Sequence, residues 1–144
     1  MAAVAGWVEG LKEKIASGIL KSNLISFYFP KEGVEYLRKN ITFLPEIMIE
    51  RENKALQIEY VYVDSEHRGI GLAQQLIKTH IANAIEIYPD MKKVQVQLFA
   101  NNEAANKLYS KLGFINKEYF KSENQEIFNY LPYNTTLLME LNIR

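Results

Sequence analysis

Residues 63–76 read VDSEHRGIGLAQQL, a strand end that runs into a glycine-rich turn and then into a helix. The first N–H groups of a helix have no acceptor inside the helix and carry a partial positive charge. Gly69 and Gly71 lack the side chains that would block a close approach, and Arg68 adds a cation with a planar fork of donors. The turn is therefore typical of a phosphate-binding loop.

Other phosphate-binding motifs fit this stretch less well. A dinucleotide-binding G-x-G-x-x-G turn would need glycine at Gln74, and an acidic residue at the end of the next strand, where residues 98–100 read LFA. A P-loop needs G-x-x-x-x-G-K followed by Ser or Thr, and the chain has no such run. The loop sequence alone is also compatible with a plain strand-to-helix turn in which the two glycines serve only the backbone geometry.

Apolar periodicity on either side of the loop predicts the order of elements. We expect helices over residues 31–40, 71–88 and 102–112, and strands over residues 55–63, 94–100, 114–120 and 135–143. Residues 46–50 and 55–63 flank a charged turn, which predicts a β-hairpin. The strand, helix and strand over 55–100 predict a parallel β-α-β unit.

The N-terminal part is harder to place. Val4, Trp7, Val8, Leu11, Ile15 and Ile19 follow helical spacing, so we expect an amphipathic helix there, and residues 24–29 are a short apolar run of strand-like composition. No clear first strand is visible. We therefore expect residues 24–29 to supply one in an unusual order, or a missing N-terminal piece or a homodimer to cover the bare sheet edge.

Composition describes one ordinary domain. The 144 residues are expected to form a single domain, with an atypical helical part over 1–45 and a cofactor-binding core over 46–144. Seventeen basic residues balance seventeen acidic ones, which argues against a nucleic-acid partner. There is no apolar run of about 18 residues, so we expect no membrane span and a cytoplasmic protein.

Residue types also limit the chemistry. The absence of cysteine excludes disulfides and thiolate sites, and two histidines without a carboxylate pattern predict no metal. His67 is interpreted as a solvated turn residue and His80 as a half-buried structural residue.

Two motifs together resemble the GNAT N-acetyltransferase superfamily. Arg68-x-x-Gly71-x-Ala73 matches the family's Q/R-x-x-G-x-G/A loop, and residues 102–114, NEAANKLYSKLGF, resemble its N-x-x-A-x-x-L-Y-x-x-x-G-F helix. One helix and one strand separate the motifs, as in the family. The resemblance covers about residues 46–143 and implies an α/β (α+β) fold with a mixed, mostly antiparallel sheet, a central parallel β-α-β unit and flanking helices.

The resemblance also implies a coenzyme and the residues that hold it. Acetyl-CoA would be the co-substrate, with its pyrophosphate on the loop and its pantetheine arm along the preceding strand. The residues implied are Val61, Tyr62, Val63, Arg68, Gly69, Ile70, Gly71, Leu72, Ala73, Gln74 and Asn102. The family places Tyr109 near the sulfur as the acid that protonates the leaving thiolate, whereas periodicity alone makes it a core aromatic.

Glu59 is our candidate for the base that accepts the proton of the amine. In polyamine-acetylating relatives, a glutamate at the same spacing from the loop arginine is a proposed base. Strand alternation puts Glu59 on the side of Val61 and Val63, and a solvent-exposed glutamate at the sheet edge is the alternative.

The function implied is transfer of an acetyl group to a primary amine of a small molecule or peptide, by direct attack in a ternary complex. A non-catalytic coenzyme-binding module or sensor, and a structural domain with an empty loop, stay open as alternatives.

Overall fold

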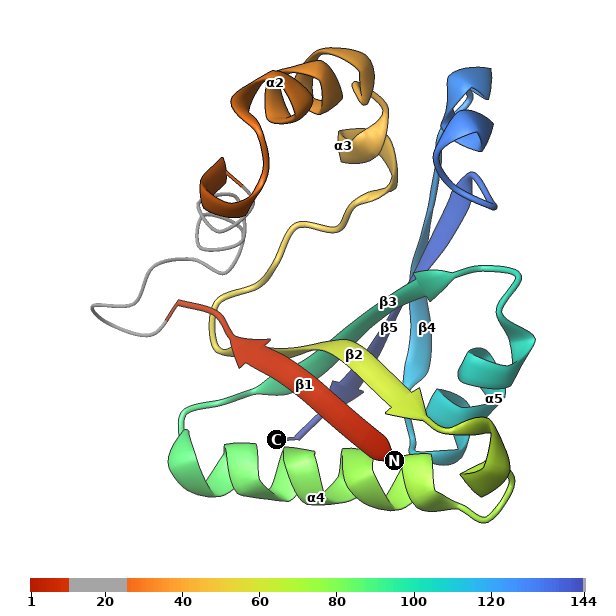
Figure 1. Cartoon of the computed structure of the whole chain (residues 1–144). Helices are drawn as coiled ribbons and strands as arrows, with labels where there is room; N and C mark the ends of the chain where they lie inside the picture. Colours follow the sequence, from red (N-terminus) through yellow and green to blue (C-terminus); the bar gives the residue numbers. More distant parts are fainter. Residues whose placement is uncertain (11–25, 144) are drawn as a thin grey trace.

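A computed structural model describes residues 1–10 and 26–143, and it contains a five-stranded sheet in the order β1-β2-β3-β5-β4 (Figure 1). β2 and β3 are parallel, and the other neighbouring pairs are antiparallel. The strands are β1 (Ala2–Val8), β2 (Ala55–Val63), β3 (Lys93–Phe99), β4 (Ile115–Lys121) and β5 (Thr135–Asn142). This confirms the expected mixed, mostly antiparallel sheet with one parallel unit.

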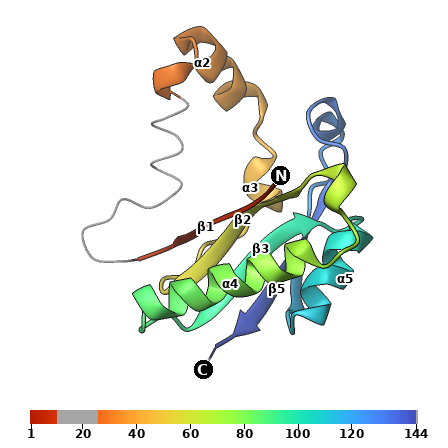
Figure 2. The ribbon, with the colours of Figure 1, turned by 60° about the horizontal axis from the view of Figure 1, so that its bottom comes forward.

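Two helices connect the strands that carry the motifs. α4 (Leu72–Ile87) joins β2 to β3 and runs across one face of the sheet, and α5 (Glu103–Lys111) joins β3 to β4 (Figure 2). Other helical segments among the described residues include α2 (Lys31–Asn40), α3 (Leu44–Ile47), η1 (Ser65–His67) and η2 (Gln125–Asn129). In Figure 1, α2 and α3 stand on the other side of the sheet from α4. Within the described ranges, no helix is long and apolar enough to cross a bilayer.

The two faces of the sheet differ in chemistry. Toward α4 and α5, alternate strand residues form one apolar core with both helices: Leu56, Ile58, Val94, Val96, Leu98, Leu137 and Met139. The opposite face buries polar side chains. Gln57 donates to Gln95, and Gln95 donates to Glu140 at 2.7 Å. Lys93 lies 2.9 Å from Glu52 and lowers the pKa of that carboxyl by hydrogen bonding and by charge.

The prediction of a helix at the N-terminus is wrong for the residues that the structure describes. Ala2–Val8 is a strand that pairs antiparallel with β2 from Ala2 opposite Val63 to Val8 opposite Leu56. The predicted helix positions Leu11, Ile15 and Ile19 lie outside the described residues. Local spacing favours a helix, but docking on β2 supplies backbone hydrogen bonds along a whole strand edge, and these outweigh a weak local preference.

The predicted hairpin of residues 46–50 with β2 is also wrong. α3 (Leu44–Ile47) covers the start of that segment, and β1 is the antiparallel neighbour of β2. Of the run 24–29, residues 26–28 are helical rather than extended, and residues 24 and 25 lie outside the described residues. β1 is the strand that the sequence left unassigned, and it covers the edge of β2, while β1 itself is the outer strand of the sheet.

Gly6 lets β1 lie close to its neighbours. A Cβ atom at this position would be 2.7 Å from the carbonyl oxygen of Gln57 and 2.8 Å from Nε2 of His80. Both distances are too short for carbon. His80 Nε2 is buried and has no hydrogen-bond partner among the described residues, and burial lowers the pKa of His80. Glycine at position 6 is thus a packing requirement of the strand.

Gly6→Ala tests the strand assignment by the sign of its effect. In a helix, the change would stabilise the protein by up to about 1 kcal/mol. In β1, it forces an atom against backbone and should lower the free energy of unfolding by about 1–3 kcal/mol. Gly33→Ala is the matched control, because Gly33 lies within α2 and its Cβ would meet no atom within 4 Å. Urea unfolding of both variants decides: Gly6→Ala more stable than wild type would contradict the strand.

Candidate functional site

A cleft opens where β2 and β3 part. Their parallel pairing ends at Ile58 opposite Val96, and Figure 1 shows the two strands diverging beyond that point. The cleft has a volume of about 850 Å³ and is lined by residues 59–63 of β2 and 97–99 of β3, together with the loop before α4 and one side of α5. This volume is typical of a small-molecule site.

A β-bulge lies where the strands part. Ala5 pairs with Tyr60 while Gly6 pairs with Ile58, so Glu59 is the extra residue of β2. A bulge interrupts the alternation of side chains. Ile58 and Val61 accordingly both pack in the apolar core although they are three residues apart. The prediction that strand alternation places Glu59 on the same face as Val61 and Val63 is therefore wrong. The extra residue of the bulge changes which of the following positions face the apolar core.

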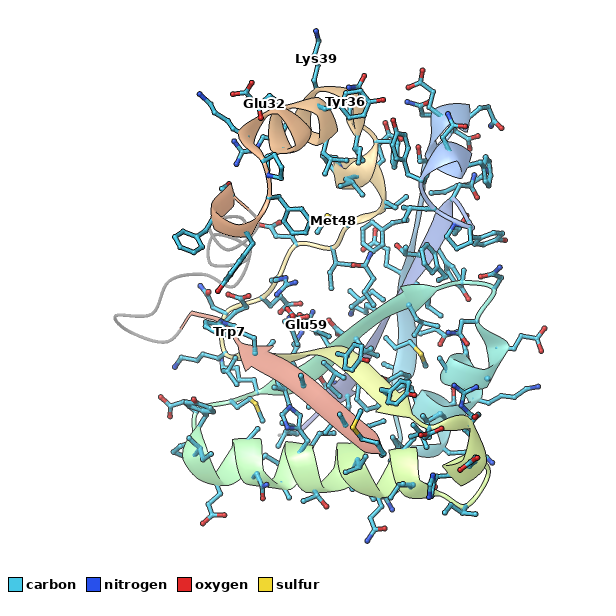
Figure 3. All side chains as sticks on the ribbon, in the orientation of Figure 1. Trp7, Glu32, Tyr36, Lys39, Met48 and Glu59 are labelled. Atoms are coloured by element: carbon cyan, nitrogen blue, oxygen red, sulfur yellow. The ribbon has the colours of Figure 1, made fainter. Side chains whose placement is uncertain are left out.

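Glu59 instead joins the polar side of the sheet. Its carboxylate forms an ion pair with Arg51, and Nη1 of Arg51 also lies 3.2 Å from the carboxylate of Glu9. In Figure 3, Glu59 and Met48 lie on the same side of the sheet, opposite α4. Glu59 nevertheless lines the cleft. Glu59 is thus a residue of the cleft lining whose carboxylate pairs on the polar face.

The glycine-rich loop has the geometry of an anion cradle. Gly69 and Gly71 each adopt φ +81°, and Gly71 caps the start of α4. A Cβ at either glycine would meet no atom within 4 Å, so both look onto open space. Arg68 Nε donates to the carbonyl of Val63 at 3.0 Å, which ties its side chain to the end of β2. Free space, helix N–H groups and a tethered cation together fit a phosphate.

The second motif forms the facing wall. The side chain of Asn102 caps α5 by accepting from the N–H of Ala105 at 3.1 Å, and Asn102 also lines the cleft. Tyr109 lines it too, although the residue is only 5% exposed and its ring packs edge-on against Phe114. Burial raises the pKa of Tyr109 to about 12. Tyr109 is therefore both a core aromatic and a protonated phenol at the cleft wall.

Almost all the predicted site residues meet in this cleft. Those that line it are Glu59, Val61, Tyr62, Val63, Arg68, Gly69, Gly71, Leu72, Ala73, Gln74, Asn102 and Tyr109. Ile70 is the exception, since it does not line the cleft and the residue is 73% exposed.

Some lining residues were not predicted. Among them are Tyr60, His67, Gln97, Phe99, Lys107 and Lys111, and the sequence predicts only a solvated turn residue at His67. Lys107 and Lys111 are one helical turn apart on α5, a spacing that indicates a shared face. The other residues carry no signal of their own in the sequence.

Comparison with known proteins gives a consistent family. The model of the acetyltransferase (GNAT) domain matches residues 39–116. Spermine/spermidine N(1)-acetyltransferase of Bacillus subtilis (strain 168) is 29% identical over 92 residues, covering 60% of each chain. The chain thus spans about 60% of the length of the curated relatives it matches.

Solved structures share the fold. Ribosomal-protein-alanine N-acetyltransferase from Brucella melitensis superposes with a TM-score of 0.52 at 23% identity, over 62% of this chain and 52% of that one. Arabidopsis thaliana NAA60 in complex with acetyl-CoA superposes with a TM-score of 0.53 at 21% identity, over 62% and 48%.

The buried phenol predicts a pH effect on stability. Because the pKa of Tyr109 is about 12 in the folded protein and about 10 when exposed, the unfolded chain loses this proton first as pH rises. The contribution of Tyr109 to the free energy of unfolding is therefore fully present below pH 10 and is lost between pH 10 and 12. From pH 9 to pH 11, wild type should lose about 1 kcal/mol more than Tyr109→Phe. Denaturant titrations at the two pH values measure this; equal losses would show that the phenol is solvated.

Proposed function

Since the chain belongs to the GNAT acetyltransferase family, whose domain model matches residues 39–116, we propose that it transfers the acetyl group of acetyl-CoA to a primary amine. One observation carries the proposal. The cleft where β2 and β3 part joins the loop of Arg68 and Gly71 with Asn102 and Tyr109, three segments that are separate in sequence.

The loop and the end of β2 would hold the coenzyme. The pyrophosphate is bound by the N–H groups of residues 69–73, with Arg68 as counter-charge and Lys107 and Lys111 on the facing wall. Beyond Ile58, β2 no longer pairs with β3, so its backbone there can bind the amide groups of the pantetheine arm. The thioester supplies an activated acyl carbon, and no metal is required.

The acceptor amine must lose a proton before it attacks. An alkylamine with a pKa near 10 is neutral about once in a thousand molecules at pH 7, a cost of about 4 kcal/mol. Glu59 accepts this proton, directly or through one water. The free amine then attacks the acyl carbon, the carbon–sulfur bond breaks, and the nitrogen loses its second proton, which balances the proton that the thiolate takes up.

Tyr109 stabilises the leaving thiolate. With a pKa of about 12, its phenol is a much weaker acid than an ordinary thiol of pKa about 8.5, so complete transfer would cost about 5 kcal/mol. Its proton is therefore shared as a hydrogen bond to the sulfur as negative charge develops, and the thiolate is protonated after it departs. This refines the role of Tyr109 from proton donor to hydrogen-bond donor.

The first acceptor to test is an alkyl polyamine. The curated relative from Bacillus subtilis is named for spermine and spermidine. A glutamate in the cleft lining suits an acceptor that arrives as an ammonium ion. Peptide amines are the next class to test, because the Brucella structure is of an enzyme named for a ribosomal-protein alanine.

Gly71→Ala tests the coenzyme loop. The new methyl group would project into the space proposed for the pyrophosphate, so acetyl-CoA affinity should fall at least tenfold. Gly113→Ala is the matched control. Gly113 has a similar φ of +91° but does not line the cleft. Gly113→Ala therefore strains the backbone in the same way without placing a methyl group in the cleft. Calorimetric titration compares the two; equal affinity in both variants and wild type would remove the loop from coenzyme binding.

Tyr109→Phe tests the chemistry. The change keeps the ring in its packing site but removes the hydrogen bond to the departing sulfur, so kcat should fall about 10²–10³-fold. Thiol release is measured at saturating acetyl-CoA with spermidine as acceptor, so that weaker binding is not mistaken for slower chemistry. Wild-type turnover in the variant would make Tyr109 a packing residue only. Acetyl-CoA binding by wild type without thiol release, over a broad amine panel, would favour a coenzyme-binding module.

A further inference from the structure

Arg51 has an arrangement that the proposed chemistry does not use. It lies in the loop before β2, and one nitrogen of its guanidinium contacts two carboxylates, those of Glu9 at the end of β1 and Glu59 at the bulge. The side chains of Arg51 and Glu59 are 25% and 23% exposed, whereas that of Glu9 is 5% exposed. Of these three residues, only Glu59 lines the coenzyme cleft.

The pair with Arg51 opposes the task proposed for Glu59. The guanidinium of Arg51 already pairs with the negative charge of Glu59 that would attract an acceptor ammonium. An acceptor ammonium would have to compete with Arg51 for Oε1 of Glu59, which the guanidinium contacts. Glu59 can therefore act on the acceptor only after Arg51 has moved from it.

The arrangement keeps the free-energy cost of replacing Arg51 by an ammonium at Glu59 small. Breaking a buried ion pair is costly when it leaves a charge without a partner. Here Arg51 retains Glu9, which lies 3.2 Å from its Nη1, while Glu59 gains the ammonium of the acceptor. Every charge stays paired on both sides of the exchange.

Space is available for the movement. Arg51 lines a second cleft of about 570 Å³ on the polar face, together with Glu50, Glu52, Glu118 and Glu140. Lys117 also lines this cleft, and Lys93 pairs with Glu52 and Glu140. The four carboxylates still outnumber these two cations, so they offer the guanidinium a favourable field when it leaves Glu59.

We propose that Arg51 is a positioning residue that holds Glu59 in an internal ion pair until the ammonium group of the acceptor replaces it. This rests on the proposed function and adds to it a rule of acceptor selection. An acceptor must arrive as a cation able to compete with a guanidinium. The proton then passes from that ammonium to Glu59, which leaves a neutral amine beside a neutral carboxyl group.

The test is the affinity for spermidine in variants of Arg51. Arg51→Gln removes the competitor, so the KM for spermidine should fall about three- to tenfold, since a partly exposed ion pair contributes a modest free energy. The value of kcat should change by less than about threefold. Lys121→Gln is the control, because it removes one exposed cation that pairs with Glu123 and lines neither cleft. An unchanged or raised KM in Arg51→Gln overturns the proposal.

Further variants keep the test decisive if Arg51→Gln does not fold. The double change Arg51→Gln with Glu9→Gln removes the buried carboxylate that would lose its arginine. Arg51→Lys keeps the charge but holds two carboxylates less well, so its KM should lie between those of wild type and Arg51→Gln. Wild-type KM in the variants that fold overturns the proposal.

A binding measurement separates this inference from the proposed reaction. Calorimetric titration with spermidine reports the exchange at Glu59 without turnover. Tighter binding in the Arg51 variants, with no thiol release from any variant or from wild type, supports the exchange and refutes the acetyl transfer. Normal thiol release with unaltered spermidine affinity overturns the exchange and leaves the acetyl transfer standing.

Discussion

The parting of β2 and β3 beyond Ile58 and Val96 is the constraint on which the rest of the site depends. Two parallel strands that stay paired offer no room between them, whereas two that diverge leave strand backbone facing a cleft. The bulge at Glu59 lies at this point, and it turns a carboxylate away from the apolar core that holds Ile58 and Val61. The interruption of the β2–β3 pairing thus creates the cleft, and a separate bulge in the β1–β2 pairing places a charged residue in its lining.

β1 makes that interruption stable. It pairs with β2 along the full length of the strand, so β2 keeps a neighbour on one edge after it has lost β3 on the other. The end of β1 also supplies Glu9, which shares Arg51 with Glu59. The strand that supports the cleft and the cluster that holds its carboxylate are therefore one structural unit.

Several features could be predicted from the sequence because they are local. The turn with Gly69 and Gly71, the cap at Asn102 and the glycine after α5 each depend on residues a few positions apart. Their order and spacing also predicted α4, β3 and α5 between the two motifs. The two predictions that were wrong share a different cause. β1 has helical spacing, and residues 46–50 look like half of a hairpin, but pairing with a distant strand decided both.

The sequence by itself determined the turn at Gly69 and Gly71 and the cap at Asn102, which line the cleft, since strand, turn and helix start are contiguous and their dihedral angles follow from glycine and capping residues. Only the tertiary structure decided which way Glu59 points and what it contacts. The direction depends on a bulge set by the register with β1, and Arg51 meets Glu9 across 42 positions of the chain. Local conformational preferences operate within a few residues, whereas strand register and ion pairing depend on which distant segments the fold brings together.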